Sequence, residues 1–203
     1  MAPVKGKDEN SREKIIRAAV KEFSISGYHG ARVDAIAKRS GINKAMIYYH
    51  FKNKDGLYQA IIGQLFDKIS TIINEHAALE MPPDEKLFTM IRSLSTFIYG
   101  LGDDMRRVML WEVAAGGKNI IAIGGKRIVQ IVPVVKKMYE DGMKNGTFRK
   151  DINPLLTHVS IIGSIIFANI IHMNVKDSLI MKVFLNEKNI VEKFNSNFIS
   201  IVK

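Results

Sequence analysis

The sequence contains no cysteine, a single tryptophan and five prolines among its 203 residues. The absence of cysteine excludes a disulfide framework, a thiolate metal site and a cysteine nucleophile, and it fits a reducing compartment, so we expect a cytoplasmic protein. The first ten residues, MAPVKGKDEN, have no apolar run behind their positive charges and do not read as a secretory signal. The five histidines show no metal-ligand spacing, and no paired carboxylates, nucleophile–base set or phosphate loop appears. We therefore expect no metal, no cofactor and no enzymatic site.

Positive charge is concentrated near the N-terminus. The chain has a net charge of +10, of which residues 1–60 contribute +6 and the remaining 143 residues +4. Such an excess favours a polyanionic partner, either nucleic acid or an anionic membrane, although charge alone fits an ordinary solvated surface equally well. The uncharged stretch between Asp151 and Lys176 is long enough to span a bilayer, but its polar residues and its Asn153–Pro154 start favour a buried helix of a bundle.

Apolar residues recur at helical spacing along almost the whole chain, which predicts an all-α fold. Ser11 is expected to cap the first helix and Gly27 to end it, and Pro133 is expected to kink a later one. The last pattern reaches residue 203 without a C-cap, which leaves open that the natural chain extends further. The expected helices span residues 11–27, a short segment around 33–37, 44–51, 54–78, 85–101, 103–115, 126–144, 155–174 and about 187–203.

Residues 33–51 have the layout of a helix-turn-helix. Ala37 is small enough for two helices to cross closely, and Gly41 can take the left-handed conformation that turns the chain. Ile42 and Ile47 are then expected to fill the small core between the helices. The spacing alone is moderately specific, but together with the basic N-terminal part it indicates a DNA-binding domain.

Helical geometry assigns the faces of the second helix of this motif. Lys44 stands at its N-terminal end, where it can donate to guanine N7 and O6, and Ala45 can meet a thymine methyl group. Tyr49 is expected to join them as a base contact. The side chains expected to contact phosphates are those of Asn43, Tyr48, His50 and Lys54.

Residues 11–58, SREKIIRAAVKEFSISGYHGARVDAIAKRSGINKAMIYYHFKNKDGLY, carry a specific combination of motifs. The combination comprises Phe23, Gly27–Tyr28, Ile36–Ala37, Gly41–Ile42, Tyr48, Phe51 and Lys54-Asp55-x-Leu57. The segment resembles the DNA-binding domain of the tetracycline-repressor (TetR) family. The resemblance implies an all-helical homodimer in which residues 1–58 bind DNA and a long helix leads to a ligand-binding and dimerisation domain at residues 59–203.

Two positions depart from the family pattern. Arg32 stands where the family usually has a Ser or Thr that caps the second helix, so the cap is lost, but a cation there can grip a phosphate. Gly56 replaces a usual helix former and is expected to loosen its helix by up to ~1 kcal/mol relative to alanine.

The C-terminal half is expected to enclose a mainly apolar pocket for a hydrophobic or weakly polar ligand. Its candidate lining residues are Phe88, Phe97, Met105, Met109, Trp111, Met138 and Phe167, with Trp111 and Phe167 favoured. Side chains of this kind at helical spacing are more often plain core. The expected dimer interface comprises Ser160, Ile161, Ser164, Ile165, Ala168, Phe194 and Phe198.

The sequence thus predicts a ligand-responsive, sequence-specific transcriptional regulator that binds double-stranded DNA as a homodimer. A repressor released from its operator by a small hydrophobic molecule is the favoured form. Two alternatives stay open: a DNA-compacting architectural protein without ligand control, and an enzyme. The first would not need residues 85–203, which form a larger and more apolar part than the DNA-binding one, and the second lacks a recognisable catalytic set.

Overall fold

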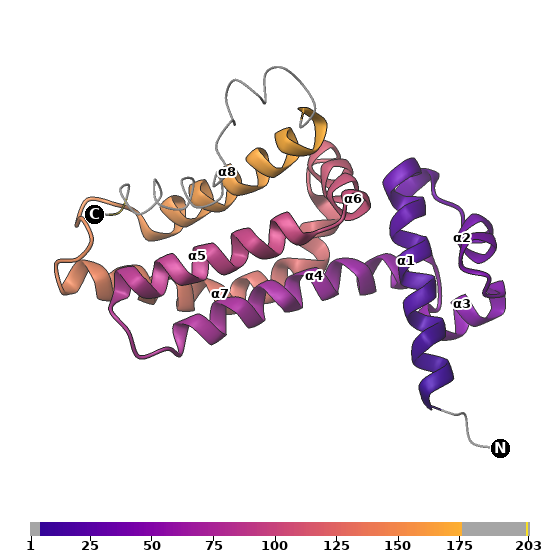
Figure 1. Cartoon of the computed structure of the whole chain (residues 1–203), viewed down its shortest axis with the longest axis horizontal. Coiled ribbons are helices and arrows are strands. Elements are labelled where there is room, and N and C mark those ends of the chain that lie inside the picture. The colour runs from indigo at the N-terminus through magenta and orange to yellow at the C-terminus, as the bar shows by residue number, and fades with distance from the viewer. Residues whose placement is uncertain (1–4, 176–201, 203) are drawn as a thin grey trace. The chain divides into compact units, whose positions relative to one another are not determined.

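The computed structural model describes residues 5–175 and residue 202 of the chain. In this part the structure is helical, with no strand among the described residues, as the periodicity predicts (Figure 1). The helices are α1 (Lys5–Gly30), α2 (Val33–Ser40), α3 (Lys44–Phe51), α4 (Lys54–Ala77), α5 (Pro83–Gly100), α6 (Asp103–Ala114), α7 (Lys118–Lys144) and α8 (Pro154–Val175).

The predicted bounds hold closely for the helices between α2 and α6, and two helices begin earlier than expected. α1 starts at Lys5 and not at a Ser11 cap, because no proline after Pro3 interrupts the segment. Gly27 interrupts α1 as predicted, with φ 63° and ψ 179°. α7 starts at Lys118 and continues through Pro133. The helix expected at 187–203 lies outside the described residues except for residue 202.

None of the described helices is both long and apolar enough to cross a membrane. The bilayer-spanning alternative for the stretch after Asp151 is therefore not supported. α8 contains His158, Ser160, Ser164 and Asn169 within its apolar sequence, as a buried helix of a bundle does.

The chain folds into two compact units. Unit 1 comprises residues 1–66 and 102–125, and unit 2 comprises residues 67–101 and 126–203. These units differ from the division after residue 58 expected from the sequence. The reason is that α6, far along the chain, packs against α1 within unit 1.

An apolar core closes unit 1 around the first turns of α4. Phe23 of α1 meets the ring of Tyr58 of α4 edge-on, with centroids 4.8 Å apart, and Tyr28 lies 4.9 Å from the same ring. The most deeply buried apolar side chains of unit 1 are Ile15, Ala19, Phe23, Ile36, Ile47, Leu57, Ile61, Ile62 and Val108. Each of α1, α2, α3, α4 and α6 contributes to this set, so burial fixes all five against one another.

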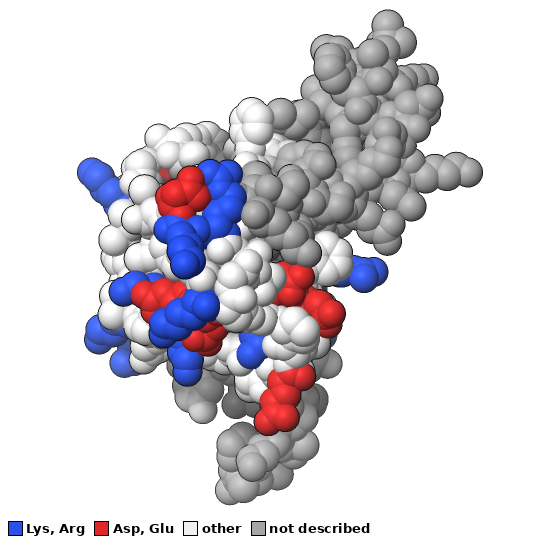
Figure 2. Space-filling model, turned by 90° about the vertical axis from the view of Figure 1, so that its left-hand side faces the viewer, with Lys and Arg blue, Asp and Glu red and all other residues white. Residues whose placement is uncertain are grey.

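Unit 2 is a helical bundle with an almost entirely apolar centre. Side chains of α4, α5, α7 and α8 form one buried cluster, and α5 packs against α8. The cluster includes Ile73, Leu87, Met90, Ile91, Leu94, Val135, Met138, Tyr139, Phe148, Ile161 and Ile165. Figure 2 faces the end of unit 2 that holds the α4–α5 and α7–α8 connections, where basic and acidic side chains are interspersed. The described basic side chains at that end therefore form no continuous positive surface for a polyanion.

Candidate nucleic-acid interface

The turn between α2 and α3 is built by two residues. Gly41 takes the left-handed conformation (φ 69°, ψ 13°) that the sequence predicts. Asn43 then caps α3, because its side-chain oxygen accepts a hydrogen bond from the backbone N–H of Met46 at 2.8 Å. Ile36, Ile47 and Phe51 are buried on the inner face, which orients the two short helices.

The opposite face of α3 is open to solvent. Ala45 is exposed, and Tyr48 and Tyr49 retain 42% and 68% of their accessible surface. Large aromatic side chains are usually buried at least in part. Two neighbouring exposed tyrosines therefore favour a surface that binds a partner. The face assignment made from helical geometry is therefore consistent with the structure, whereas the DNA contacts themselves remain predictions.

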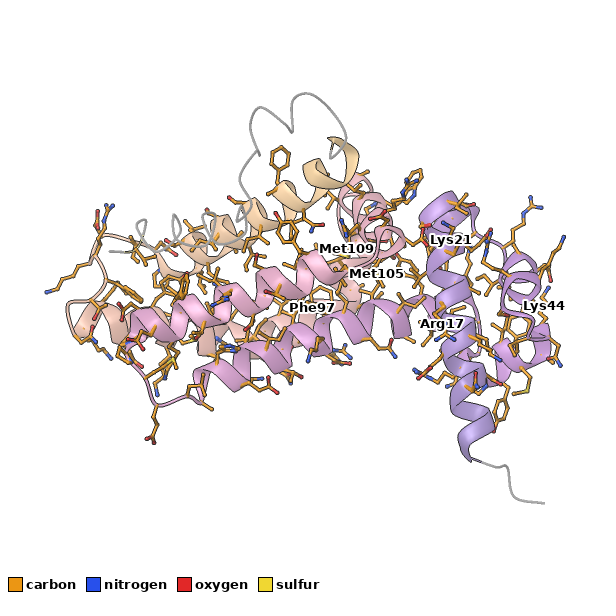
Figure 3. The ribbon with its side chains drawn as sticks, in the orientation of Figure 1. Arg17, Lys21, Lys44, Phe97, Met105 and Met109 are labelled. Carbon is orange, nitrogen blue, oxygen red and sulfur yellow. The ribbon has the colours of Figure 1, made fainter. Side chains whose placement is uncertain are left out.

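Lys44, labelled in Figure 3, begins α3, and its ammonium group lies near side chains of two neighbours. Its ammonium nitrogen lies 2.7 Å from a carboxylate oxygen of Asp34 in α2 and 6.0 Å from the centre of the Tyr48 ring. The hydrogen bond to Asp34 raises the pKa of Lys44, so this side chain is a cation at any physiological pH.

His50 and Arg32 differ in how free they are to reach a phosphate. The His50 ring is half-buried between the rings of Tyr49 and Phe51, at centroid distances of 5.2 and 5.9 Å. Arg32 is exposed at the N-cap position of α2, where its side chain makes no capping hydrogen bond. The loss of the cap expected from the sequence is confirmed, and the guanidinium faces solvent.

Lys54 has a structural role that the sequence reading did not foresee. Its ammonium nitrogen donates to the backbone oxygens of Tyr28, His29 and Ala31, at 2.9, 3.3 and 3.2 Å. An ammonium has three protons, so these bonds use all of them. A phosphate contact would require one of them to be given up, and we therefore reassign Lys54 from a phosphate contact to a cap on the end of α1.

Two further side chains tie the end of α1 to the start of α4. The Tyr28 hydroxyl donates a hydrogen bond to Asp55, and the Lys54 ammonium lies 4.8 Å from the centre of the Tyr28 ring. Burial, followed by the hydrogen bond to Asp55, raises the pKa of Tyr28 to about 12. The Gly-Tyr and Lys-Asp pairs that carry the family resemblance thus meet in space.

Gly56 is required by a close approach. A Cβ atom at this position would collide with the backbone oxygen of Phe51. The expectation that glycine only loosens α4 is therefore wrong, since alanine would not fit without a shift of the backbone.

A buried polar network inside unit 1 was not predicted. Glu112 of α6 is 2% exposed, and one of its carboxylate oxygens accepts hydrogen bonds from the Tyr58 hydroxyl at 2.5 Å and the Asn119 amide at 2.9 Å. Burial and the Glu112 hydrogen bond both raise the pKa of Tyr58. A lone glutamate on an amphipathic helix gives no sequence signal that separates this position from a solvent-facing one.

The seven candidate pocket residues fall into different units. Met105, Met109 and Trp111 of α6 belong to unit 1, whereas Phe88, Phe97, Met138 and Phe167 belong to unit 2. The Trp111 indole N–H donates to the Ser24 backbone oxygen at 3.2 Å, and its ring packs on Gly27 within unit 1. The Phe167 side chain is 64% exposed, and the pocket itself remains a prediction.

The described part of unit 2 contains three buried uncharged polar groups with no hydrogen-bond partner, namely the hydroxyls of Ser70 and Tyr139 and Nδ1 of His158. The Tyr139 hydroxyl and His158 Nδ1 are buried, and their rings meet edge-on with centroids 6.1 Å apart. Burial lowers the pKa of His158 to about 4 and raises the pKa of Tyr139, so both side chains are neutral at pH 7. Met138 belongs to the same buried cluster, and Phe97 is partly buried and packs against that cluster.

The predicted dimer residues are only partly available on α8. Ile161 and Ile165 are each 1% exposed and belong to the core of unit 2, so the expectation that they offer apolar area to a partner is wrong. Ser160 is exposed, and Ser164 and Ala168 are half-buried beside it. Phe194 and Phe198 lie outside the described residues. Within residues 154–170 of α8, the exposed large apolar side chains are those of Leu156, Val159 and Phe167.

Comparison with known proteins identifies the helical arrangement. Residues 15–61 match the family described as bacterial regulatory proteins, tetR family. The chain is 26% identical over 159 residues to the HTH-type transcriptional repressor NicS of Pseudomonas putida, a match that covers 74% of this chain and 70% of NicS. The similarity to the tetR family of bacterial regulatory proteins thus covers residues 15–61, which contain α2 and α3.

Two further matches show how the similarity is distributed. Residues of the IcaR negative transcriptional regulator of the Staphylococcus aureus biofilm operon icaADBC are 42% identical over 62 positions, which span 30% of this chain and 33% of IcaR. The FadR transcriptional regulator of Bacillus subtilis, solved in complex with stearoyl-CoA, superposes with a TM-score of 0.69 at 18% identity, over 93% of this chain and 96% of FadR. The fold is thus shared along nearly the whole chain. The helix-turn-helix of unit 1 lies within the residues that match the tetR family model.

Proposed function

We propose that the protein is a homodimeric repressor that reads its operator with α3 and leaves it when a hydrophobic or weakly polar molecule binds to unit 2. The observation that carries the DNA-reading part is the solvent-facing surface of α3. There Lys44, Ala45, Tyr48 and Tyr49 are exposed on a helix whose other side is buried. The curated relatives NicS and IcaR are repressors, which supports repression as the sign of control.

Each side chain of this surface has a distinct task. Lys44 and Tyr49 read base edges, and Ala45 lets the backbone come close to a thymine methyl group. Tyr48, Arg32, His50 and the amide of Asn43 contact phosphates and so fix the register of the helix on the duplex. Two copies of α3 in a dimer need a separation of about 34–36 Å to enter successive major grooves on one side of the DNA.

The ligand part of the proposal follows from the composition of unit 2. Its buried cluster is aliphatic, methionine-rich and aromatic, and its buried polar groups without a partner among the described residues, those of Ser70, Tyr139 and His158, are neutral. An uncharged or weakly polar molecule suits such an interior better than a multiply charged one. FadR of Bacillus subtilis, which shares the fold, has been solved with stearoyl-CoA, so a protein of this fold can take a ligand with a long acyl chain.

Release of DNA requires a preference of the ligand for one conformation. A ligand that bound the operator-competent and the operator-incompetent conformations equally well would leave the equilibrium unchanged. We therefore expect a saturating ligand to weaken operator affinity by at most the ratio of its affinities for the two conformations, and the operator to weaken ligand binding by the same factor.

The DNA-reading part is tested by comparing substitutions on α3. Duplexes selected from a random pool by the full-length protein supply the specific site, and a scrambled duplex of equal length supplies the reference. Lys44→Ala and Tyr49→Ala should change the preferred sequence, with a loss of ~1–3 kcal/mol in binding free energy per base contact. Tyr48→Phe should weaken binding to both duplexes by the same factor. Equal losses on both duplexes for all three variants would show that α3 does not read bases as proposed.

A further inference from the structure

The lysine that stands at the tip of the reading helix is not free in the absence of DNA. The Lys44 ammonium and the Asp34 carboxylate are 2.7 Å apart, and the two side chains keep 44% and 75% of their accessible surface. Asp34 belongs to the first turn of α2 and Lys44 is the first residue of α3, so the ion pair bridges the two helices of the motif.

This ion pair does little for the stability of the fold. Exposed ion pairs contribute about 0–1 kcal/mol because both partners are well solvated. The helices are already fixed by the Asn43 cap, the Gly41 turn and the buried side chains of Ile36 and Ile47. An acidic side chain at this place also opposes the approach of phosphates, which a DNA-binding surface would otherwise avoid.

The chemistry of the ammonium suggests what the carboxylate does. A lysine has three donor protons, and guanine presents two acceptors, O6 and N7, in the major groove. If Asp34 accepts one of these protons, the other two can be donated to O6 and N7 of guanine. The ion pair then also keeps the Lys44 side chain oriented toward the base edges. An unanchored lysine would be a mobile point charge that binds any phosphate nearby.

We propose that Asp34 is a specificity-determining residue, which acts by holding Lys44 toward base edges and by lowering the affinity of the reading surface for DNA of arbitrary sequence. This inference rests on the proposed role of α3 in DNA recognition. Asp34 is a positioning residue in this scheme, because it acts through Lys44 and does not itself contact a base.

The proposal makes a numerical statement about salt. Replacing Asp34 by asparagine keeps the shape of the side chain and removes its charge, which frees Lys44 for a phosphate. One additional phosphate contact steepens the dependence of log affinity on log salt concentration by about 0.9, so the ratio of affinities at 50 and 200 mM salt grows roughly threefold. We expect this change on the scrambled duplex.

The experiment measures binding of full-length wild type, Asp34→Asn, Lys44→Ala and the double variant to three duplexes. These are a duplex selected from a random pool by the wild type, the same duplex with its preferred guanine replaced, and a scrambled one. Asp34→Asn should bind the scrambled duplex more tightly and lose about threefold or more of the discrimination between the first two. Lys44→Ala should lose roughly 5- to 150-fold of that discrimination. In the Lys44→Ala background, Asp34→Asn should leave discrimination unchanged.

A matched control tests whether the position of the removed negative charge matters, or only the change in net charge. Glu13 pairs with Arg17 on α1 at 3.6 Å and is exposed to a similar degree, so Glu13→Gln removes the same charge from the same unit. It should leave discrimination as in the wild type. Asp34 also lies at the start of α2, which lacks a side-chain cap, and thermal unfolding of each variant reports any loss of helix stability from that cause.

The outcomes separate this inference from the proposed function. If Lys44→Ala changes discrimination but Asp34→Asn does not, the role of Asp34 is refuted while α3 remains the reading helix. If Asp34→Asn lowers discrimination equally in the Lys44→Ala background, Asp34 does not act through Lys44 and the inference is again refuted. If Lys44→Ala itself changes nothing, both the assignment of Lys44 and the inference fall.

Discussion

Units 1 and 2 solve the problem of packing helices in different ways. Unit 1 joins its helices by polar bonds between named side chains, such as Lys54 to the end of α1, Tyr28 to Asp55 and Tyr58 to Glu112. The centre of unit 2 relies on a broad apolar cluster drawn from α4, α5, α7 and α8. Its buried Tyr139 hydroxyl and His158 Nδ1 have no hydrogen-bond partner within the described residues.

The difference corresponds to the two tasks of the ligand-controlled regulator that we propose. Directional polar bonds allow few alternative packings, and a surface that reads base edges needs its side chains in fixed places. Apolar contacts are non-directional, and methionine in particular adapts to irregular space, so such a core can repack around a ligand at a modest cost. We therefore expect substitutions in unit 1 to change DNA reading and those in unit 2 to change assembly, ligand response and pH dependence.

The largest effect is expected at the exposed face of α8, where one substitution in unit 2 should disrupt assembly of the dimer. Phe167 is 64% exposed, on the helix that we propose as the dimer interface. Phe167→Glu should convert the dimer to a monomer, because a charge would be buried between the two copies. Loss of the second reading head should lower affinity for a two-half-site operator by about 100-fold or more. Light scattering and binding to single and double half-sites measure both effects.

Val129→Glu on α7 is the matched control for this change. Val129 is 71% exposed, so the substitution adds the same charge to a surface position of unit 2 outside α8. It should leave the dimer and operator affinity intact. A wild-type protein that is monomeric at micromolar concentration, or a dimer unaffected by Phe167→Glu, would contradict the assigned interface.

The second effect concerns His158, whose burial in unit 2 depresses its pKa to about 4 from an ordinary value near 6.5. Between these pH values the unfolded chain binds a proton that the folded chain does not, so stability from this group is present above pH 6.5 and is lost as pH falls toward 4. The full difference corresponds to about 3 kcal/mol. Urea unfolding of the wild type and His158→Phe at several pH values measures it. The substituted protein should lose most of the slope in this window, and an unchanged slope would show that His158 is not buried as a neutral group.

The third effect tests how tightly unit 1 is packed. Gly56→Ala would place a Cβ atom against the Phe51 backbone oxygen, and we expect a loss of about 1–3 kcal/mol in the free energy of unfolding. Gly125→Ala in α7 is the control, since a Cβ atom there meets nothing within 4 Å. That change should stabilise by about 0.4–1 kcal/mol, as alanine does in a helix. If Gly56→Ala stabilised the protein as well, the close approach of the chain at Phe51 would be disproved.

The same contrast between units explains what the sequence could predict. Local signals sufficed for α2 and α3, since Gly41 and the period of Ile47 and Phe51 act within a few residues of themselves. The faces of α8 were assigned less well, because its sequence is apolar all round and gives no period to tell Ile161 from Phe167. The position of Trp111 against Gly27 and of Glu112 beside Tyr58 depends on contacts between segments more than fifty residues apart, which local patterns do not report.

The smallest effect concerns Lys54, where the structure and the sequence reading give opposite expectations. A phosphate contact would make Lys54→Met flatten the salt dependence of DNA binding by about 0.9 in log–log slope. The structure instead places the ammonium on the backbone oxygens of Tyr28, His29 and Ala31. Lys54→Met keeps the length of the side chain and removes these bonds, so we expect a loss of about 1 kcal/mol in the free energy of unfolding. The salt slope should stay within error of the wild type, because the charge was already directed inward.

Arg32→Met provides the contrast, since the exposed Arg32 side chain makes no capping bond. Its loss should flatten the salt dependence of DNA binding with little change in the free energy of unfolding. If the two variants behaved the other way round, Lys54 would be the phosphate contact and the polar ties of unit 1 would be weaker than the structure indicates.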